Sequence, residues 1–280
     1  MTSLTTLPLA AATGPRARFR DLVAAEWIKL WSLRSTAWVF VLGALTVLAF
    51  NGGTAYDTYR YWSQRNGSDR ADFIGDGIPI LHAFTSNGAL VHMLVLGAVG
   101  ALPVVGEYAT GLIRTTFAAV PDRRSVMAAK VTVIAAVTTA FGAAVSAGSF
   151  VLTQAILSGR DAGVGITHPG ALRAVVASAL LAPVCALAGM ALGTLVRHGA
   201  TTMAAAFGVL ILLPAVLTDD RHWTAVLSHA LPLNAWDRLA QPGGPPDLFP
   251  WTATGAWTVY AAWALAAAAI TVTAVQRRDQ

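Results

Sequence analysis

The sequence predicts an all-α membrane protein with six transmembrane helices. The chain of 280 residues is 55% hydrophobic and only 12% charged, about half the charged share of soluble domains. Its long apolar runs approach or exceed the ~20 residues that a helix needs to span a bilayer. They are continuously apolar, which argues against the alternating strands of a transmembrane barrel. We expect one membrane domain over residues 35–280, with spans at about 35–54, 84–105, 130–158, 174–196, 200–217 and 251–275.

The segment before the first span divides into two parts. Residues 1–18 carry no basic residue ahead of their short apolar stretch, so they read as a disordered lead-in and not as a cleavable signal peptide. Residues 19–34 predict an amphipathic helix that lies in the membrane interface, because tryptophans and basic residues flank an apolar face. The alternative is that this helix simply extends the first span into water. The apolar residues at helical spacing are Phe19, Leu22, Val23, Trp27, Leu30 and Leu33.

The distribution of basic residues predicts the orientation in the membrane. A net charge of +5 could indicate nucleic-acid binding, but basic residues in membrane proteins usually mark the loops on the cytoplasmic side. Most of the 19 Lys and Arg residues fall before the first span, between the second and third spans, between the fourth and fifth, and after the sixth. We therefore expect both termini and the 106–124 segment in the cytoplasm, in a multi-pass protein of the cytoplasmic membrane that binds no nucleic acid.

The segment between the second and third spans, GEYATGLIRTTFAAVPDRR, combines charge with a short amphipathic pattern. A helix of about Gly111 to Ala119 would carry one apolar side, and Pro121 would end it, since the residue before proline is pushed out of the helical region. Glu107 lies where lipid headgroups make an unpaired carboxylate costly, which indicates a specific contact. The apolar side comprises Leu112, Ile113, Thr116, Phe117 and Val120, and basic residues follow at Arg123 and Arg124.

Catalytic and ligand-binding signatures are missing from the sequence. It has no phosphate-binding loop, no metalloprotease motif and no nucleophile elbow, so we expect no enzyme and no cofactor in this chain. His222 and His229 with Asp219 and Asp220 match no established ligand spacing, so we expect no metal. Gly189 and Gly193 form a Gly-x-x-x-Gly pair, which is typical of close helix packing.

These motifs together resemble the ABC-2-type permeases, the membrane subunits of one class of ATP-binding cassette transporters. In the coupling segment of that family, an acidic residue, a turn, an apolar helix, Pro, Arg and Lys follow one another. Here Glu107, Gly111, Ile113, Arg114, Pro121, Arg124 and Lys130 fill that pattern, with Leu112 where Thr is often found. The family's interfacial Glu-Trp-x-Lys-Leu core is matched by Glu26, Trp27, Lys29 and Leu30, and its Leu-Pro element by Leu231 to Leu239.

The resemblance implies a transporter, with export as the expected direction. Such a permease pairs with a second permease subunit, identical or homologous, and with two nucleotide-binding ATPase subunits that hold ATP and Mg. The helix from Gly111 to Val120, Phe117 included, would be the cytoplasmic coupling helix that docks on the ATPase. Pathway candidates on the second and fifth spans are Asn87, His92, Thr201, Thr202, Met203 and Phe207. The alternative is a non-transporting membrane scaffold or sensor subunit whose basic loop docks on anionic lipid.

Overall fold

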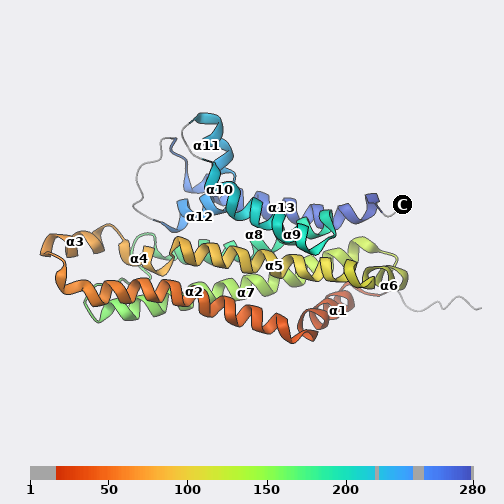
Figure 1. Cartoon of the computed structure of the whole chain (residues 1–280), viewed down its shortest axis with the longest axis horizontal. Helices are drawn as coiled ribbons and strands as arrows, with labels where there is room; N and C mark the ends of the chain where they lie inside the picture. Colours follow the sequence, from red (N-terminus) through yellow and green to blue (C-terminus); the bar gives the residue numbers. More distant parts are fainter. Residues whose placement is uncertain (1–16, 218–220, 242–248, 279–280) are drawn as a thin grey trace, which may run out of the picture.

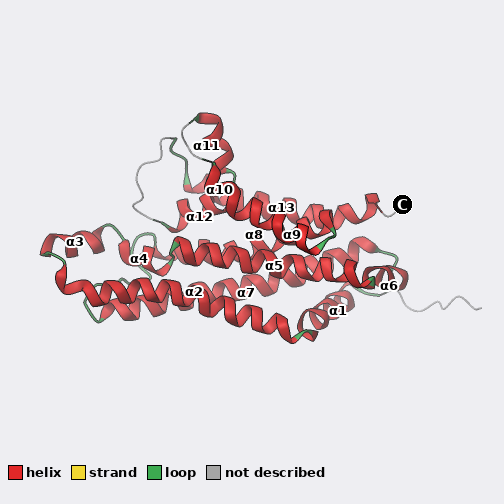
Figure 2. Cartoon of the chain, viewed as in Figure 1, coloured by secondary structure: helices red, strands yellow, loops and turns green. Residues whose placement is uncertain are grey.

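The computed structural model describes residues 17–217, 221–241 and 249–278, and most of these residues are helical. Figure 2 shows helices joined by short loops, with no strand in this part of the chain. Most of the predicted lead-in, residues 1–16, lies outside the described residues. The helices are α1 (Phe19–Ser32), α2 (Arg34–Tyr61), α3 (Gly67–Gly75), α4 (Ile78–Ala83), α5 (Ser86–Thr110), α6 (Leu112–Ala119), α7 (Arg123–Ser158), α8 (Ala171–Val196), α9 (Gly199–Phe207), α10 (Leu213–Val216), α11 (His222–His229), α12 (Pro232–Ala240) and α13 (Ala253–Arg278).

Within the described residues, six helical segments are long and apolar enough to cross a membrane, which confirms the predicted number and makes the chain a multi-pass membrane protein. The fifth of them joins α9, a π-helical turn at Gly208–Leu212 and α10. The segments are Arg34–Gln64, Ile78–Thr110, Arg123–Ser158, Ala171–Val196, Gly199–Val216 and Ala253–Val275.

The long helices run side by side along the longest axis of the molecule, and α8 is the most buried of them (Figure 1). Because α8 packs against α5, α7, α12 and α13, the main hydrophobic core forms around it. Figure 1 shows α1, α6 and the C-terminal end of α13 at one end of the bundle, and α3 and α4 at the other. We call the first of these the α6 end. Both termini of the described chain therefore lie at the α6 end.

Two segments expected as outer loops contain helices. Helix α2 runs on to Tyr61, because its continuation packs Ala55 into a small core with Phe73 and Leu157. Helix α3 follows, and at its start Asn66 and Asp69 form a capping box. After the fifth span, α12 is held to the bundle because the Trp236 indole donates a hydrogen bond to Ser178 Oγ on α8 (2.9 Å).

Small residues allow α5 and α8 to approach until their backbones touch. A Cβ added at Gly100 would overlap the carbonyl oxygen of Ala186, and one added at Gly189 would overlap that of Gly97. Without a hydrophobic driving force between helices in lipid, such backbone contact is a main source of helix association. The packing role expected for Gly189 is confirmed at this contact.

Replacing Gly100 by alanine should destabilise the bundle, because a methyl group there forces α5 and α8 apart. We expect a loss of about 1–3 kcal/mol in the free energy of unfolding, measured by thermal or denaturant unfolding of the detergent-solubilised protein. Gly53→Ala on α2 is the matched control, since a Cβ there meets nothing within 4 Å. Equal stability of the Gly100 and Gly53 variants would contradict the close packing of α5 on α8.

Candidate functional site

The chain turns sharply between α5 and α6, and this turn places a short helix beside the end of the second span. Gly111 adopts a left-handed conformation with φ of 74°, which glycine reaches without the steric cost that a Cβ imposes. Helix α6 ends at Ala119, and Val120 before Pro121 is extended with φ of −128°. Asp122 then caps α7 by accepting a hydrogen bond from the backbone N–H of Ser125 (3.2 Å). The predicted helix and its end at proline are therefore present in the structure.

A ring of four charged side chains, Glu26, Lys29, Glu107 and Lys130, joins α1, α5 and α7 at the α6 end. We call it the charge ring. Lys29 Nζ lies 2.7 Å from Glu26 Oε1 and 3.1 Å from Glu107 Oε1. Lys130 Nζ lies 2.9 Å from the same Glu107 oxygen and also donates to Glu26 Oε2. Each carboxylate therefore binds both lysines, and the ring closes.

Three members of the charge ring are almost fully removed from solvent. Glu26 is 5% exposed, Glu107 is 7% exposed and Lys130 is 2% exposed. Removing a charge from water costs several kcal/mol, and a partner with good hydrogen-bond geometry is needed to offset that cost. Glu107 thus has the specific contact that its position in the sequence indicated, and the partners lie within this chain.

Lys29 is the member of the ring that water reaches, with a side chain 32% exposed. Burial acts to lower its pKa, but the hydrogen bond and charge of Glu26, together with Glu107, outweigh burial and raise the pKa above its ordinary 10.5. A pKa that is raised by folding contributes stability that is fully present below 10.5 and is lost as pH rises through the higher folded value. The ring therefore keeps this charge throughout the neutral range.

Helix α6 divides into a side that faces the bundle and a side that faces outward. Ile113 is buried, and Phe117 is partly buried with the Arg123 guanidinium 5.3 Å from its ring centroid. Leu112 is 44% exposed, although the sequence pattern placed it on the apolar side. Arg114 is exposed on the same helix. The remaining predicted coupling residues that are exposed are Pro121 and Arg124.

Helix α1 is a separate helix and not a straight extension of the first span. The break lies at Leu33, which is extended with φ of −94° and ψ of 119°. Glu26 and Leu30 face the bundle, whereas Trp27 is 50% exposed and lies beside Trp31, with ring centroids 5.9 Å apart and the ring planes tilted by 59°. The outward aromatic face is the kind of surface that lies in a membrane interface.

The pathway candidates do not converge on one site. Asn87 and Thr201 are exposed, whereas His92 and Thr202 are buried. A Cβ added at Gly199 on α9 would meet Val105, and one added at Gly97 would meet Leu210 in the π-helical turn after α9. The fifth span therefore runs back along the second half of α5. His92 lies on the first half of α5, outside the part that the fifth span contacts. Met203, partly buried, and Phe207, 46% exposed, lie with Thr201 and Thr202 on α9.

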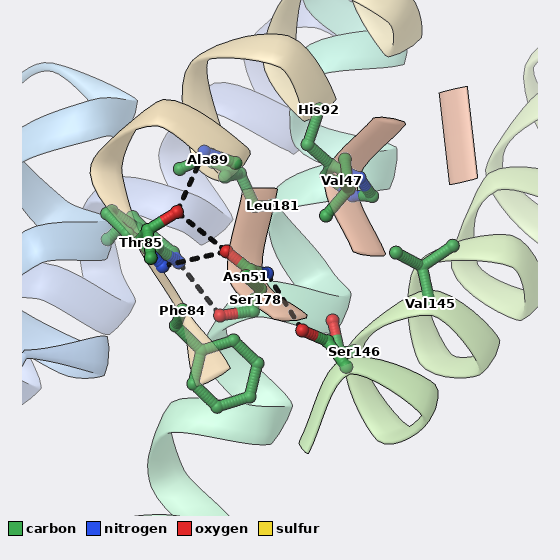
Figure 3. Close-up of a pocket in the computed structure, with 13 residues that line it drawn as sticks. Val47, Asn51, Phe84, Thr85, Ala89, His92, Val145, Ser146, Ser178 and Leu181 are labelled. Atoms are coloured by element: carbon green, nitrogen blue, oxygen red, sulfur yellow. Dashed lines mark hydrogen bonds between the residues drawn. The ribbon is translucent and has the colours of Figure 1, made fainter. Parts of the chain in front are cut away.

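The polar residues of the spans gather instead around a small cavity at the opposite half of α5 (Figure 3). Asn51 accepts hydrogen bonds from the backbone N–H (3.1 Å) and hydroxyl (2.6 Å) of Thr85 and donates one to Ser149 Oγ (2.8 Å). The cavity encloses about 20 Å³, room for about one water molecule. His92 borders it and stacks on Phe141 with centroids 5.9 Å apart. The hydrogen bonds of this cluster are suited to holding the helices together. The cavity itself is too small for a substrate.

No protein-family model matches the chain, and no curated protein matches it. The side chains at the α6 end define the chemistry of the site. They form a closed ionic junction at the end of α5, one turn before an exposed helix that carries Arg114, and this junction is the candidate functional site.

The closure of the charge ring could not be foreseen from the sequence. Lys130 is the last residue of the pattern that resembles a coupling segment, but the sequence assigned it no contact of its own. Glu26 lies 104 positions before it in the chain. The available signal was that Glu107 and Lys130 are charged residues next to the ends of apolar runs, where each needs a partner. Which residue pairs with which depends on how the helices cross, and the pattern does not contain that information.

Replacing Lys130 by methionine should destabilise the protein by about 3–5 kcal/mol, because two buried carboxylates then share one lysine. Replacing Glu26 by methionine at the same time should recover most of this loss, since Glu107 and Lys29 remain paired. Unfolding of both single variants and the double variant in detergent gives the coupling energy.

Arg114→Met is the control for this cycle, because Arg114 is exposed and its loss should change stability by no more than about 0.5 kcal/mol. If the Lys130 variant were as stable as the Arg114 variant, or if the double variant lost the sum of both singles, the ring would not be the junction that holds these helices.

Proposed function

We propose that this chain is the permease subunit of an ATP-binding cassette transporter and works as an exporter in the cytoplasmic membrane. ATP and Mg are held by separate nucleotide-binding subunits. A second permease subunit, identical or homologous, completes the membrane part. The observation that carries the proposal is the position of α6, a short helix with an exposed side that follows, after a single turn at Gly111, the end of α5 that carries Glu107 of the charge ring.

The exposed side of α6 supports docking on another protein. Leu112 and Arg114 both face outward, and Arg124 adds a further exposed cation at the start of α7. An exposed leucine on the same helix as an exposed arginine offers both apolar area and charge-assisted hydrogen bonds to a partner surface with carboxylates. On this proposal the α6 end is cytoplasmic, which agrees with the basic residues that gather there.

The charge ring supports the transfer of movement from α6 to the membrane. Helix α6 is joined to α5 through a single turn at Gly111, and the ring binds the end of α5 to α7 and α1. A displacement of α6 by an ATPase would therefore move α1, α5 and α7 together. Because α5 and α7 also pack closely on α8, the movement would extend to the helices around α8. Alternating access would then come from movement of this bundle against that of the second permease subunit.

The arrangement of the pathway candidates supports pairing with a second permease. The cavity beside His92 holds about one water, and Thr201, Met203 and Phe207 lie elsewhere on an outer helix. The fifth and sixth spans are only about one-fifth buried within one chain. A substrate pathway would then form between two permease subunits.

The direct test is purification of the chain from its native membranes in mild detergent. We expect an ATPase with a phosphate-binding loop to copurify, and the complex to hydrolyse ATP. The paired change Leu112→Asp and Arg114→Glu should release the ATPase while the permease stays folded, because both residues are exposed. Gel filtration and quantification of the bound subunit measure the effect.

Arg60→Glu provides the matched control, since Arg60 is an exposed residue at the far end of α2. Retention of the ATPase by the Arg60 variant and its loss from the α6 variant is the expected pair of results. Absence of any such ATPase, combined with salt-sensitive binding of the wild-type chain to anionic lipid, would contradict the proposal and favour a scaffold or sensor.

A further inference from the structure

Helix α11 presents an apolar face that no other part of the described chain covers. Trp223 is 59% exposed, Val226 is 55% exposed and Leu227 is 50% exposed. These three residues lie on one side of the helix, because positions three and four apart share a face. Ala225 and Ser228, on the other side, are buried. Apolar side chains gathered on one face mark a contact surface.

The orientation of this face is fixed by hydrogen bonds on the opposite side of α11. Asn234 Nδ2 on α12 donates to the carbonyl of Ser228 (3.0 Å), and the Trp263 indole on α13 donates to the carbonyl of Ala230 (2.7 Å). The apolar face therefore cannot turn toward the bundle without breaking the bonds that hold α11 to α12 and α13.

The position of α11 indicates that lipid covers the face. The fifth span ends at Val216 after 18 residues, about 27 Å of helix, which is less than the ~30 Å apolar core of a bilayer. Helix α11 follows this span. Figure 1 shows α11 projecting sideways from the bundle beside α10, whereas α3 and α4 lie farther along the long axis. A helix that projects sideways at this level meets the boundary of the bilayer and not open water.

The residues around the face have the composition of a membrane interface. Tryptophan, here Trp223, is enriched at the level of the lipid headgroups. Arg221 at the start of α11 is exposed and can meet lipid phosphates. At the end of the fifth span, Leu212, Leu213 and Val216 are exposed and give that span an apolar outer surface.

The small size of the face favours lipid over a second protein. A standard protein–protein interface buries about 800 Å² on each partner, from roughly 20–30 residues. The exposed face of α11 consists of three large apolar side chains, which is enough to enter a lipid interface and far less than such an interface needs.

We propose that α11 is a membrane anchor whose side chains Trp223, Val226 and Leu227 insert into the lipid interface farther from the α6 end. Helix α12 links the anchor to α8, because Trp236 of α12 is bonded to Ser178. The anchor thus holds α8 at a fixed depth in the membrane. This inference does not depend on the transport proposal, and either can fail without the other.

The direct test is the depth of a spin label on the full-length chain in liposomes. Cys185 is the only cysteine of the sequence, so Cys185→Ala gives a background in which Val226→Cys alone is labelled. Collision with oxygen, which concentrates in lipid, and with a water-soluble nickel complex reports the depth. We expect the Val226 label to lie between the label of Leu265→Cys, 70% exposed on the sixth span, and that of Asp72→Cys, exposed on α3.

A second variant removes the insertion. Val226→Asp with Leu227→Asp should release α11 from the lipid, and its amides should then exchange with deuterium at least about tenfold faster in lipid nanodiscs, since burial of one leucine side chain is worth about a factor of ten or more. Ala71→Asp is the matched control, because Ala71 is exposed on α3 and the proposal places no lipid there. The exchange of α3 should change far less in that variant.

A Val226 label as accessible to the nickel complex as the Asp72 label would overturn the anchor. Disulfide-linked dimers of the Val226→Cys chain in liposomes would also overturn it, because a second copy of the chain would then cover the face. Unchanged exchange of α11 in the double aspartate variant would contradict the insertion of its apolar side chains.

Discussion

The buried charge ring fixes how the helices are arranged at the α6 end. Its members cannot be separated without leaving unpaired charges that are shielded from water. Glu26, Glu107 and Lys130 lie on three different helices. Separating any one of them from the others would leave a buried charge without its partner, at a cost of several kcal/mol. Helix α1, the end of α5 and the start of α7 are thereby held in one arrangement, and α6 follows directly from that end of α5.

The remainder of the bundle is held together by a different kind of force. Around α8 the helices meet through glycine and alanine at backbone distance, and polar side chains such as Asn51 and Trp236 connect neighbouring helices by hydrogen bonds. Close packing and scattered hydrogen bonds are the interactions expected of helices that lipid surrounds. The molecule therefore combines an ionic junction at one end with a closely packed interior. The transport proposal requires a protein that receives force at one end, and the ionic junction at the α6 end is suited to that role.

The helical class and the number of spans followed from composition and run length, since both depend on the cost of exposing backbone in lipid. The turn at Gly111 and the end of α6 before Pro121 were also predictable, because backbone sterics act locally. The extension of α2 to Tyr61 was not, because it depends on contacts with Phe73 and Leu157 that form only after folding. For the same reason the sequence indicated that Glu107 needs a partner without revealing that Lys29 and Lys130 supply it. The pathway candidates were chosen by polarity and span, and nothing in the sequence showed that His92 lies away from the residues of α9.

The most direct test of the central claim is hydrogen–deuterium exchange of the wild-type protein and a Glu26→Gln variant, followed segment by segment. If the ring holds the α6 end together, amides of α1 and α6 should exchange at least about tenfold faster in the variant, while α8 keeps its protection. Unchanged exchange in α6 would contradict the account, because the helix would then be held in place without the ring.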